Sequence, residues 1–68
     1  MTYEDVVEYL GQYGYRIRKK RRRKRLSQGQ LAKLTHTSQN VISMIENGCF
    51  LPPDYLDHAI REALKEDK

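Results

Sequence analysis

The sequence predicts an all-α fold, a compact arrangement of four to five helices. Apolar side chains recur at spacings of three and four residues in several segments, which is the period of one helical face. Helix-capping residues precede these segments, and glycine or proline follows them. No segment alternates apolar and polar residues as a half-buried strand does. With 68 residues, we expect residues 1–68 to form one small domain with a limited core.

The N-terminal segment, residues 1–14, is predicted to be an extra helix. Thr2 and Asp5 fit a capping box that opens it. Its apolar positions, continuing into the next segment, are Tyr3, Val6, Val7, Leu10, Tyr13 and Ile17. Gly11 and Gly14 each disfavour a helix by about 1 kcal/mol relative to alanine. We therefore expect a break near these glycines, and one uninterrupted helix is the alternative.

Large apolar side chains are concentrated near the N-terminus. Four of the five tyrosines lie between residues 3 and 15. We expect them to pack the N-terminal helix or a dimer seam, and stacking on nucleotides is the alternative. The segment also offers apolar surface that can supplement a thin core. The side chains concerned are Tyr3, Val6, Val7, Tyr9 and Leu10.

Residues 15–25 are predicted to form a basic helix. Every position from 16 to 25 except Ile17 is Lys or Arg, so nine of the thirteen basic side chains fall in one decapeptide. Residues 1–15 carry a charge of −3, although the net charge of the chain is +4. Such a block indicates a polyanion as partner. A solvated helix face or a nuclear-import-like tract is the other interpretation.

Two short capped helices are predicted within residues 27–48. Ser27 and Gln30 fit a second capping box, and Ser38 is a good N-cap for a helix over residues 39–47. A turn of about four residues joins the two helices directly after the basic one, which is the outline of a helix-turn-helix. The expected shared core is Leu31, Ala32, Ile42 and Ile45.

The C-terminal segment, residues 53–66, is predicted to be a further helix. Pro53 suits the first helical position, because its missing N–H has no partner to lose there. The apolar stripe of this segment is Leu56, Ala59, Ile60, Ala63 and Leu64.

The outer face of the predicted helix 39–47 carries neutral polar side chains and a methionine. An ordinary solvated helix is lined with Lys and Glu, so this face is unusual. Gln and Asn can bond to the N6/N7 edge of adenine, Ser can donate or accept, and Met can contact a thymine methyl group. The pattern predicts base reading in DNA, against the alternative of an ordinary polar face. The residues concerned are Gln39, Asn40, Ser43 and Met44.

Two motifs give the sequence a family resemblance. The pattern LSQxxLA spans residues 26–32 and IxxxENG spans residues 42–48. Together they resemble the helix-turn-helix of the Cro and phage-repressor (XRE) type, a family used as a standard example of docking in the major groove. The resemblance extends over residues 14–64 and implies a lambda-repressor-like DNA-binding domain. His36 stands where the family usually has glycine, and a histidine can adopt a left-handed conformation only at some cost.

The resemblance also implies roles for individual residues. Ser38 joins the four outer-face residues as a base-reading position. Gln28 either contacts a phosphate or supports the recognition helix by a hydrogen bond. Arg21 and Glu46 occupy the places of a partly buried ion pair, and Arg21 also leans toward phosphate. The expected phosphate contacts are Arg18, Arg21, Arg22, Gln28 and Asn47.

These observations predict a sequence-specific regulator of transcription that binds double-stranded DNA. We expect a homodimer that binds an inverted-repeat operator and acts as a repressor. The resemblance implies a protein of bacterial or phage origin that acts in the cytoplasm, associated with the nucleoid. One alternative is an RNA-binding protein that uses its arginine-rich helix. Another is a protein-interaction module or antitoxin that modulates a second regulator through a protein partner.

Catalysis, metals, cofactors and membranes are not expected. The chain has no phosphate-cradling glycine motif and no nucleophile with a base at a recognisable spacing. Cys49, His36 and His58 do not make a metal quartet. No apolar run approaches the roughly 20 residues of a membrane span, and no segment is left for a small-molecule effector domain.

Overall fold

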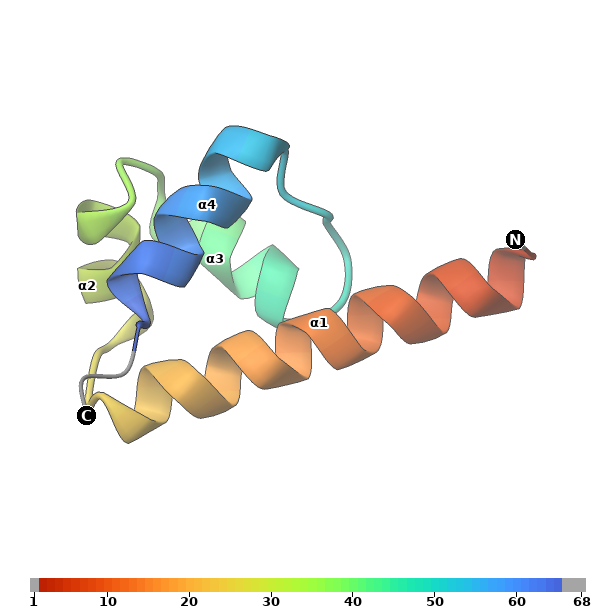
Figure 1. Cartoon of the computed structure of the whole chain (residues 1–68), viewed down its shortest axis with the longest axis horizontal. Coiled ribbons are helices and arrows are strands. Elements are labelled where there is room, and N and C mark those ends of the chain that lie inside the picture. Colours follow the sequence, from red (N-terminus) through yellow and green to blue (C-terminus); the bar gives the residue numbers. More distant parts are fainter. Residues whose placement is uncertain (1, 66–68) are drawn as a thin grey trace.

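The computed structural model describes residues 2–65, which contain four α-helices and no strand. The helices are α1 (Tyr3–Arg23), α2 (Gln28–Leu34), α3 (Gln39–Glu46) and α4 (Asp54–Ala63). Figure 1 shows α2, α3 and α4 gathered over the C-terminal half of α1, while the N-terminal end of α1 extends away from them. The prediction of an all-α fold is confirmed.

The predicted helix starts are set by their caps. Thr2 and Asp5 form a reciprocal capping box at the start of α1, and Ser27 and Gln30 form another at the start of α2. The Ser38 hydroxyl accepts from the backbone N–H of Val41 at 3.2 Å and so caps α3. Each cap satisfies backbone donors that the first helical turn leaves without partners.

The C-terminal helix is shorter than predicted. Pro53 is the N-cap of α4 rather than its first helical residue, and α4 ends at Ala63. The last predicted helical position, residue 66, lies outside the described residues.

The expected break near the first two glycines is wrong, because α1 runs unbroken from Tyr3 to Arg23. Tertiary contact outweighs the low helix propensity of glycine. A Cβ atom on Gly14 would lie 2.3 Å from the carbonyl oxygen of Ile45, so only glycine lets α1 and α3 approach this closely. Gly11 lies one turn before Gly14 on α1. Gly48, which belongs to the loop after α3 and has φ +74°, packs against Gly11. The two α1 glycines therefore mark where other segments cross the helix.

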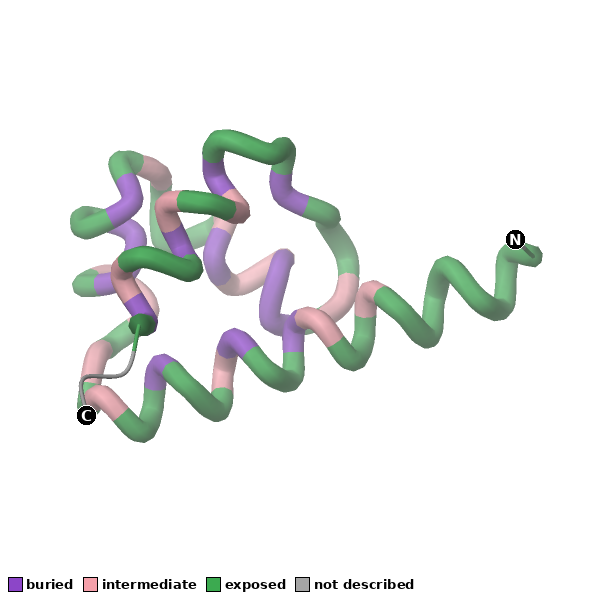
Figure 2. Tube along the Cα trace, viewed as in Figure 1, coloured by how far each residue is buried: buried purple, intermediate pink, exposed green. Residues whose placement is uncertain are grey.

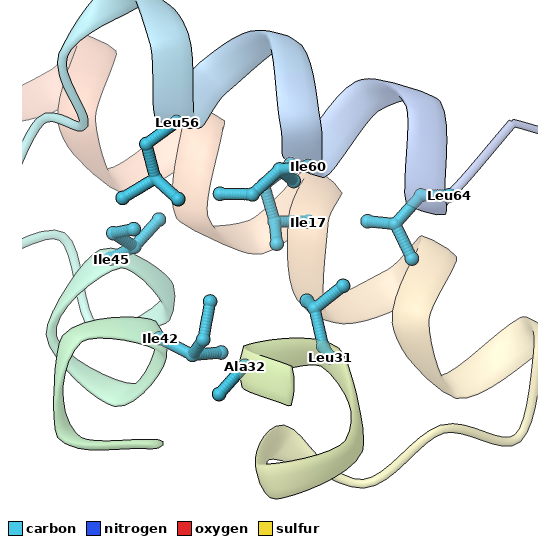
Figure 3. Close-up of a cluster of buried hydrophobic side chains, with 8 residues drawn as sticks. All are labelled: Ile17, Leu31, Ala32, Ile42, Ile45, Leu56, Ile60 and Leu64. Carbon is cyan, nitrogen blue, oxygen red and sulfur yellow. The ribbon is translucent and has the colours of Figure 1, made fainter. Parts of the chain in front are cut away.

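The core lies between the C-terminal half of α1 and the three short helices, and Figure 3 shows its side chains converging from all four. The four residues predicted for the shared core are all buried. Thr35 is also buried, and its hydroxyl donates to the carbonyl oxygen of Leu31 at 2.8 Å, so a polar residue is accommodated there. The complete cluster is Ile17, Leu31, Ala32, Ile42, Ile45, Leu56, Ile60 and Leu64.

The N-terminal apolar residues do not supplement this core, contrary to expectation. Residues 3–10 of α1, called the arm below, project beyond the other helices, and Figure 2 shows this stretch almost wholly exposed. Tyr3 is 84% exposed and Val7 49%. Among the N-terminal tyrosines, Tyr13 packs against the core, and its ring lies 6.4 Å from that of Tyr9. A straight helix cannot fold its free end back onto the core.

The turn between α2 and α3 has the geometry that the resemblance requires. His36 has φ 58°, in the left-handed region that a side chain adopts only at some cost. The backbone N–H of Thr37 donates to the carbonyl oxygen of Ala32 at 2.9 Å and closes the turn.

Candidate nucleic-acid interface

The outer face of α3 is formed by the residues predicted to read bases. Ser38, Gln39 and Asn40 are exposed, and Ser43 and Met44 are half-buried. The opposite side of α3 carries Ile42 and Ile45, which are fully buried in the core. The helix therefore presents its neutral polar side outward while the core fixes its position. These five residues are called the outer face of α3 below.

The start of α2 lies beside the start of α3. A Cβ atom on Gly29 would lie 3.6 Å from the side-chain oxygen of Gln39, so the Gln39 side chain rests over the first turn of α2. The two N-terminal ends consequently form one continuous surface.

Glu46, at the end of α3, is the centre of a buried polar network. Arg21 of α1 makes a bidentate pair with it, at 2.6 Å from Nε to Oε2 and 3.0 Å from Nη2 to Oε1. Gln28 of α2 donates its amide to the same carboxylate at 3.2 Å. The ion pair expected between Arg21 and Glu46 is thus present, and it joins α1, α2 and α3 at one point.

The network keeps the Glu46 carboxylate ionised. Burial by itself would raise the pKa of this group, but the hydrogen bonds from Arg21, Gln28 and Arg18 hold the pKa below its ordinary value of 4.5. The carboxylate is therefore charged at neutral pH, and its burial in the charged form depends on these hydrogen-bond donors.

Three of the expected phosphate contacts, Arg21, Gln28 and Arg18, donate to the Glu46 carboxylate. The third nitrogen of the Arg21 guanidinium donates to the carbonyl oxygen of Leu26 at 2.7 Å, and the residue is only 8% exposed. All three nitrogens of the Arg21 guanidinium are thus engaged within the protein, so the structure gives Arg21 a structural role and does not test the expected phosphate contact. The Gln28 amide likewise supports α3 through Glu46, which is the second of the two roles that the resemblance allowed.

Arg18 and Asn47 form a further link that the sequence interpretation missed. Arg18 Nη2 donates to Asn47 Oδ1 at 2.9 Å and to the carbonyl oxygen of Glu46 at 3.3 Å. Arg18 thereby neutralises the partial negative charge at the C-terminal end of α3. The signal was available, since Arg18 lies three residues before Arg21 and hence on a neighbouring part of the same helix surface. Arg22, one turn after Arg18, is exposed.

The basic decapeptide is divided between two sides of α1, so only part of it lies beside the end of α3. Arg16, Lys20 and Arg23 line a cleft of about 630 Å³ between α1 and α4, together with Arg61 and Lys65. A rotation of 100° per residue places these three α1 side chains roughly opposite Arg18 and Arg22. The spacing of the residues on a helical wheel could have revealed the division.

A polar link also joins α1 to α4 beside this cleft. The hydroxyl of Tyr13 donates to Asp57, which also pairs with Arg61 at 3.1 Å. Burial and the adjacent Asp57 carboxylate raise the pKa of Tyr13. The hydroxyl therefore remains a donor at all ordinary pH values.

Within residues 2–65, no group of three or more His, Cys, Asp or Glu side chains could hold a metal ion. Cys49 and His58 are exposed. None of the described helices combines the length and apolar character required to cross a membrane.

The comparisons with known proteins agree with this geometry. A family model described as helix-turn-helix matches residues 17–53, more than half of the chain, from the buried Ile17 of α1 to the loop before α4. The search of curated proteins found no match. The matched residues include α2, α3 and the Arg21–Glu46 pair, so the chain belongs to the helix-turn-helix family of the Cro and phage-repressor (XRE) type and is a DNA-binding regulator.

Proposed function

We propose that the protein is a sequence-specific transcriptional repressor that binds an inverted-repeat operator as a homodimer, with α3 of each copy in a major groove. The observation that carries this proposal is the outer face of α3. It is uncharged, exposed at its N-terminal end and held from behind by a buried core. A rigid helix with hydrogen-bonding side chains is what direct readout of base edges needs.

The chemistry of this face favours A·T-containing steps. Gln39 and Asn40 can each make two hydrogen bonds to the N6/N7 edge of an adenine. Ser43, one turn later, can donate or accept, and Met44 can contact a thymine methyl group. Ser38 combines helix capping with exposure at the end of α3 that enters the groove first.

Phosphate contacts are assigned to the half-buried Arg18 and to the exposed Asn47 and Arg22, which lie beside this face. Arg18 and Asn47 are already paired at the end of α3, and Arg22 extends the same side of α1 by one turn. Gln28 is assigned a supporting role through Glu46. Such contacts position the protein on the duplex and supply the salt-dependent part of the affinity.

Repression then follows from occupancy of promoter DNA. In the family geometry, two half-sites lie about 34 Å apart, one helical turn from centre to centre. A protein of this kind acts in the compartment that holds the DNA, and its response depends on its own concentration or on a protein partner.

The test begins by selecting binding sites from random duplexes, where we expect a palindromic consensus. Gln39→Ala is then compared with Gln12→Ala, the same chemical change at an exposed position of α1. Gln39→Ala should lose about 1 to 3 kcal/mol on the selected site and almost nothing on a scrambled duplex. Gln12→Ala should match the parent on both.

Equal losses by Gln39→Ala on selected and scrambled duplexes would contradict base reading. Preferential binding of structured RNA over duplex DNA would support the arginine-rich RNA alternative. Failure to bind any duplex near physiological salt would indicate a protein-interaction module instead.

A further inference from the structure

The arm continues the face of α1 that packs against the other helices. Gly14, Ile17 and Arg21 are the buried residues of α1. Extended backward with the same alternation of three and four residues, their stripe passes through Leu10, Val7 and Tyr3. The first half of the stripe therefore has the pattern of a buried face, but no helix within residues 2–65 packs against it.

The exposure of this stripe is unusual for a small protein. Val6 is 39% exposed and Val7 49%, while Tyr3, at 84%, alone presents on the order of 150 Å². Two turns of helix projecting into water gain little from their own hydrogen bonds, because short isolated helices are marginal. An apolar stripe of this kind indicates an interaction surface.

The loop after α3 adds apolar surface at the base of the arm. Gly48 packs against Gly11: a Cβ atom on Gly48 would lie 3.2 Å from the Gly11 Cα atom. This contact brings the loop onto α1 next to the last residue of the arm. Phe50 and Leu51 of this loop are 37% and 51% exposed. Figure 1 shows the loop meeting α1 at this point, so the arm and the loop form a corner.

We infer that this corner holds the arm of a second copy of the chain, in antiparallel orientation and reciprocally. The inference rests on the homodimer in the proposed function and names its surface. Pairing centred between Val6 and Val7 places Tyr3 opposite Leu10 and Val7 opposite Val6 of the second copy, so apolar side chains face each other along the seam. The end of each arm then reaches the Phe50–Leu51 loop of the other copy.

The charges of the arm are compatible with this pairing. Glu4, Asp5 and Glu8 are exposed, and a rotation of 100° per residue places each of them about a quarter of a turn or more from the stripe, so they do not meet across the seam. The apolar side chains of arm and loop offer on the order of 500 Å² per copy, and the two copies together reach the roughly 1,000 Å² of a specific interface.

The spacing of the two reading helices argues for a second copy rather than another protein. Helix α3 meets α1 near residues 14–18, through Gly14 and Arg18. These positions lie about ten residues from the centre of the paired arms, or roughly 15 Å at 1.5 Å per residue. The two α3 helices are then about 30 Å apart, close to the 34 Å between successive major grooves on one side of a duplex.

The symmetry also orients the two copies correctly. Antiparallel helices are related by a two-fold axis that runs across them. Surfaces on one flank of α1 therefore lie on the same side of the dimer in both copies. Arg18 and Arg22 are on such a flank, a quarter to a third of a turn from the stripe. Both candidate DNA-binding surfaces can consequently face one duplex.

The test is sedimentation equilibrium without DNA, comparing the parent chain with Val7→Asp and with Tyr55→Asp. Val7→Asp puts two unpaired charges into the seam and should weaken self-association about a hundredfold or more. Tyr55 is 77% exposed on α4 and belongs neither to the stripe nor to the Phe50–Leu51 loop, so Tyr55→Asp adds the same charge outside the paired residues and should leave the dimer unchanged. The arm does not contribute to the core cluster, so both variants should keep the folded core of the parent, and Val7→Asp should lose at most the part of the helical circular dichroism that comes from the arm.

A cross-link gives a positive readout. In a Cys49→Ser background, Val7→Cys should form a disulfide dimer under mild oxidation, whereas Glu8→Cys, on the other side of the helix, should remain monomeric. A Val7→Asp variant that still dimerises, or equal cross-linking of the two cysteine variants, would overturn the arm pairing and leave a homodimer through another surface.

DNA binding is measured separately. Val7→Asp should bind a single half-site as the parent does and lose only the added affinity of the inverted repeat. A parent chain that is monomeric at micromolar concentration yet binds its half-site would overturn the arm pairing and the homodimer while preserving base reading. A chain that pairs through its arms but shifts no duplex would support the pairing and contradict the proposed function.

Discussion

The two halves of α1 share one helical stripe but have opposite environments. In the arm, the stripe carries Tyr3, Val7 and Leu10, and none of the other described helices packs against it. In the C-terminal half, the stripe carries Gly14, Ile17 and Arg21, all buried under α2, α3 and α4. The difference teaches that a helical stripe predicts burial without saying which molecule supplies the partner.

The residue types distinguish the two halves. The C-terminal half uses a glycine where α3 crosses and an arginine where a buried carboxylate needs a donor. Each of these residues matches one particular contact in α3, so its role can be identified only when that contact is known. The arm carries mainly aromatic and aliphatic residues, which provide a large apolar contact area and can pack against many different apolar surfaces.

The largest effect is expected from Arg21→Ala, which breaks the C-terminal half. Removal of the guanidinium leaves Glu46 charged, fully buried at its side chain and without its bidentate donor. The free energy of unfolding should fall by about 3 kcal/mol or more, as measured by thermal or urea denaturation. Arg22→Ala, the neighbouring exposed arginine, is the control and should change stability by less than about 0.5 kcal/mol. Unchanged melting of the Arg21 variant would contradict the assigned role of the pair.

Acid unfolding provides a second readout of the same pair. Because the folded-state pKa of Glu46 lies below its ordinary value of 4.5, the pair contributes stability above that pH. This contribution is lost as the pH falls through the folded-state pKa and the carboxylate takes up a proton. In Arg21→Ala the lowering is smaller, so the loss of stability on acidification should be shallower than in the parent.

The next largest effect is expected from Gly14→Ala. The added methyl group would lie 2.3 Å from the carbonyl oxygen of Ile45 and 2.8 Å from that of Glu46, and both are backbone atoms that cannot turn aside. Helices α1 and α3 must separate, which should lower the free energy of unfolding by about 2 to 3 kcal/mol in urea titrations. Since α3 carries the outer face, affinity for the selected duplex should fall as well. A variant as stable as the parent would show that the close crossing is absent in solution.

Much of the fold could be predicted because its signals are local. Capping boxes at Thr2 and Ser27 and the cap at Ser38 depend on residues within one turn, and the apolar periodicity of residues 31–45 identifies a shared core. The Arg21–Glu46 pair spans 25 positions of sequence, and the family resemblance, rather than the residues themselves, made it visible.

The errors have one physical cause, which is contact between distant segments. The helix propensity of Gly14 is overruled by α3, a helix that begins 25 residues later in the chain. The position of α4 decides that Arg16 and Lys20 line a cleft on one side of α1 while Arg18 faces α3. Periodicity alone shows which residues share one face of a helix, but it does not show which other helix packs against that face.

The smallest effect, and the sharpest contrast between the halves, is expected from Gly11→Ala. A Cβ atom on Gly11 meets nothing within 4 Å, although Gly11 lies only three residues before Gly14 on the same helix. Alanine should therefore stabilise the chain by about 0.5 to 1 kcal/mol, because it restricts the unfolded backbone and favours the helix without a clash. Opposite signs for Gly11→Ala and Gly14→Ala in urea titrations would locate the start of the packed half of α1 between them. If Gly11→Ala also destabilised the chain, the packed half of α1 would begin at or before Gly11 rather than between the two glycines.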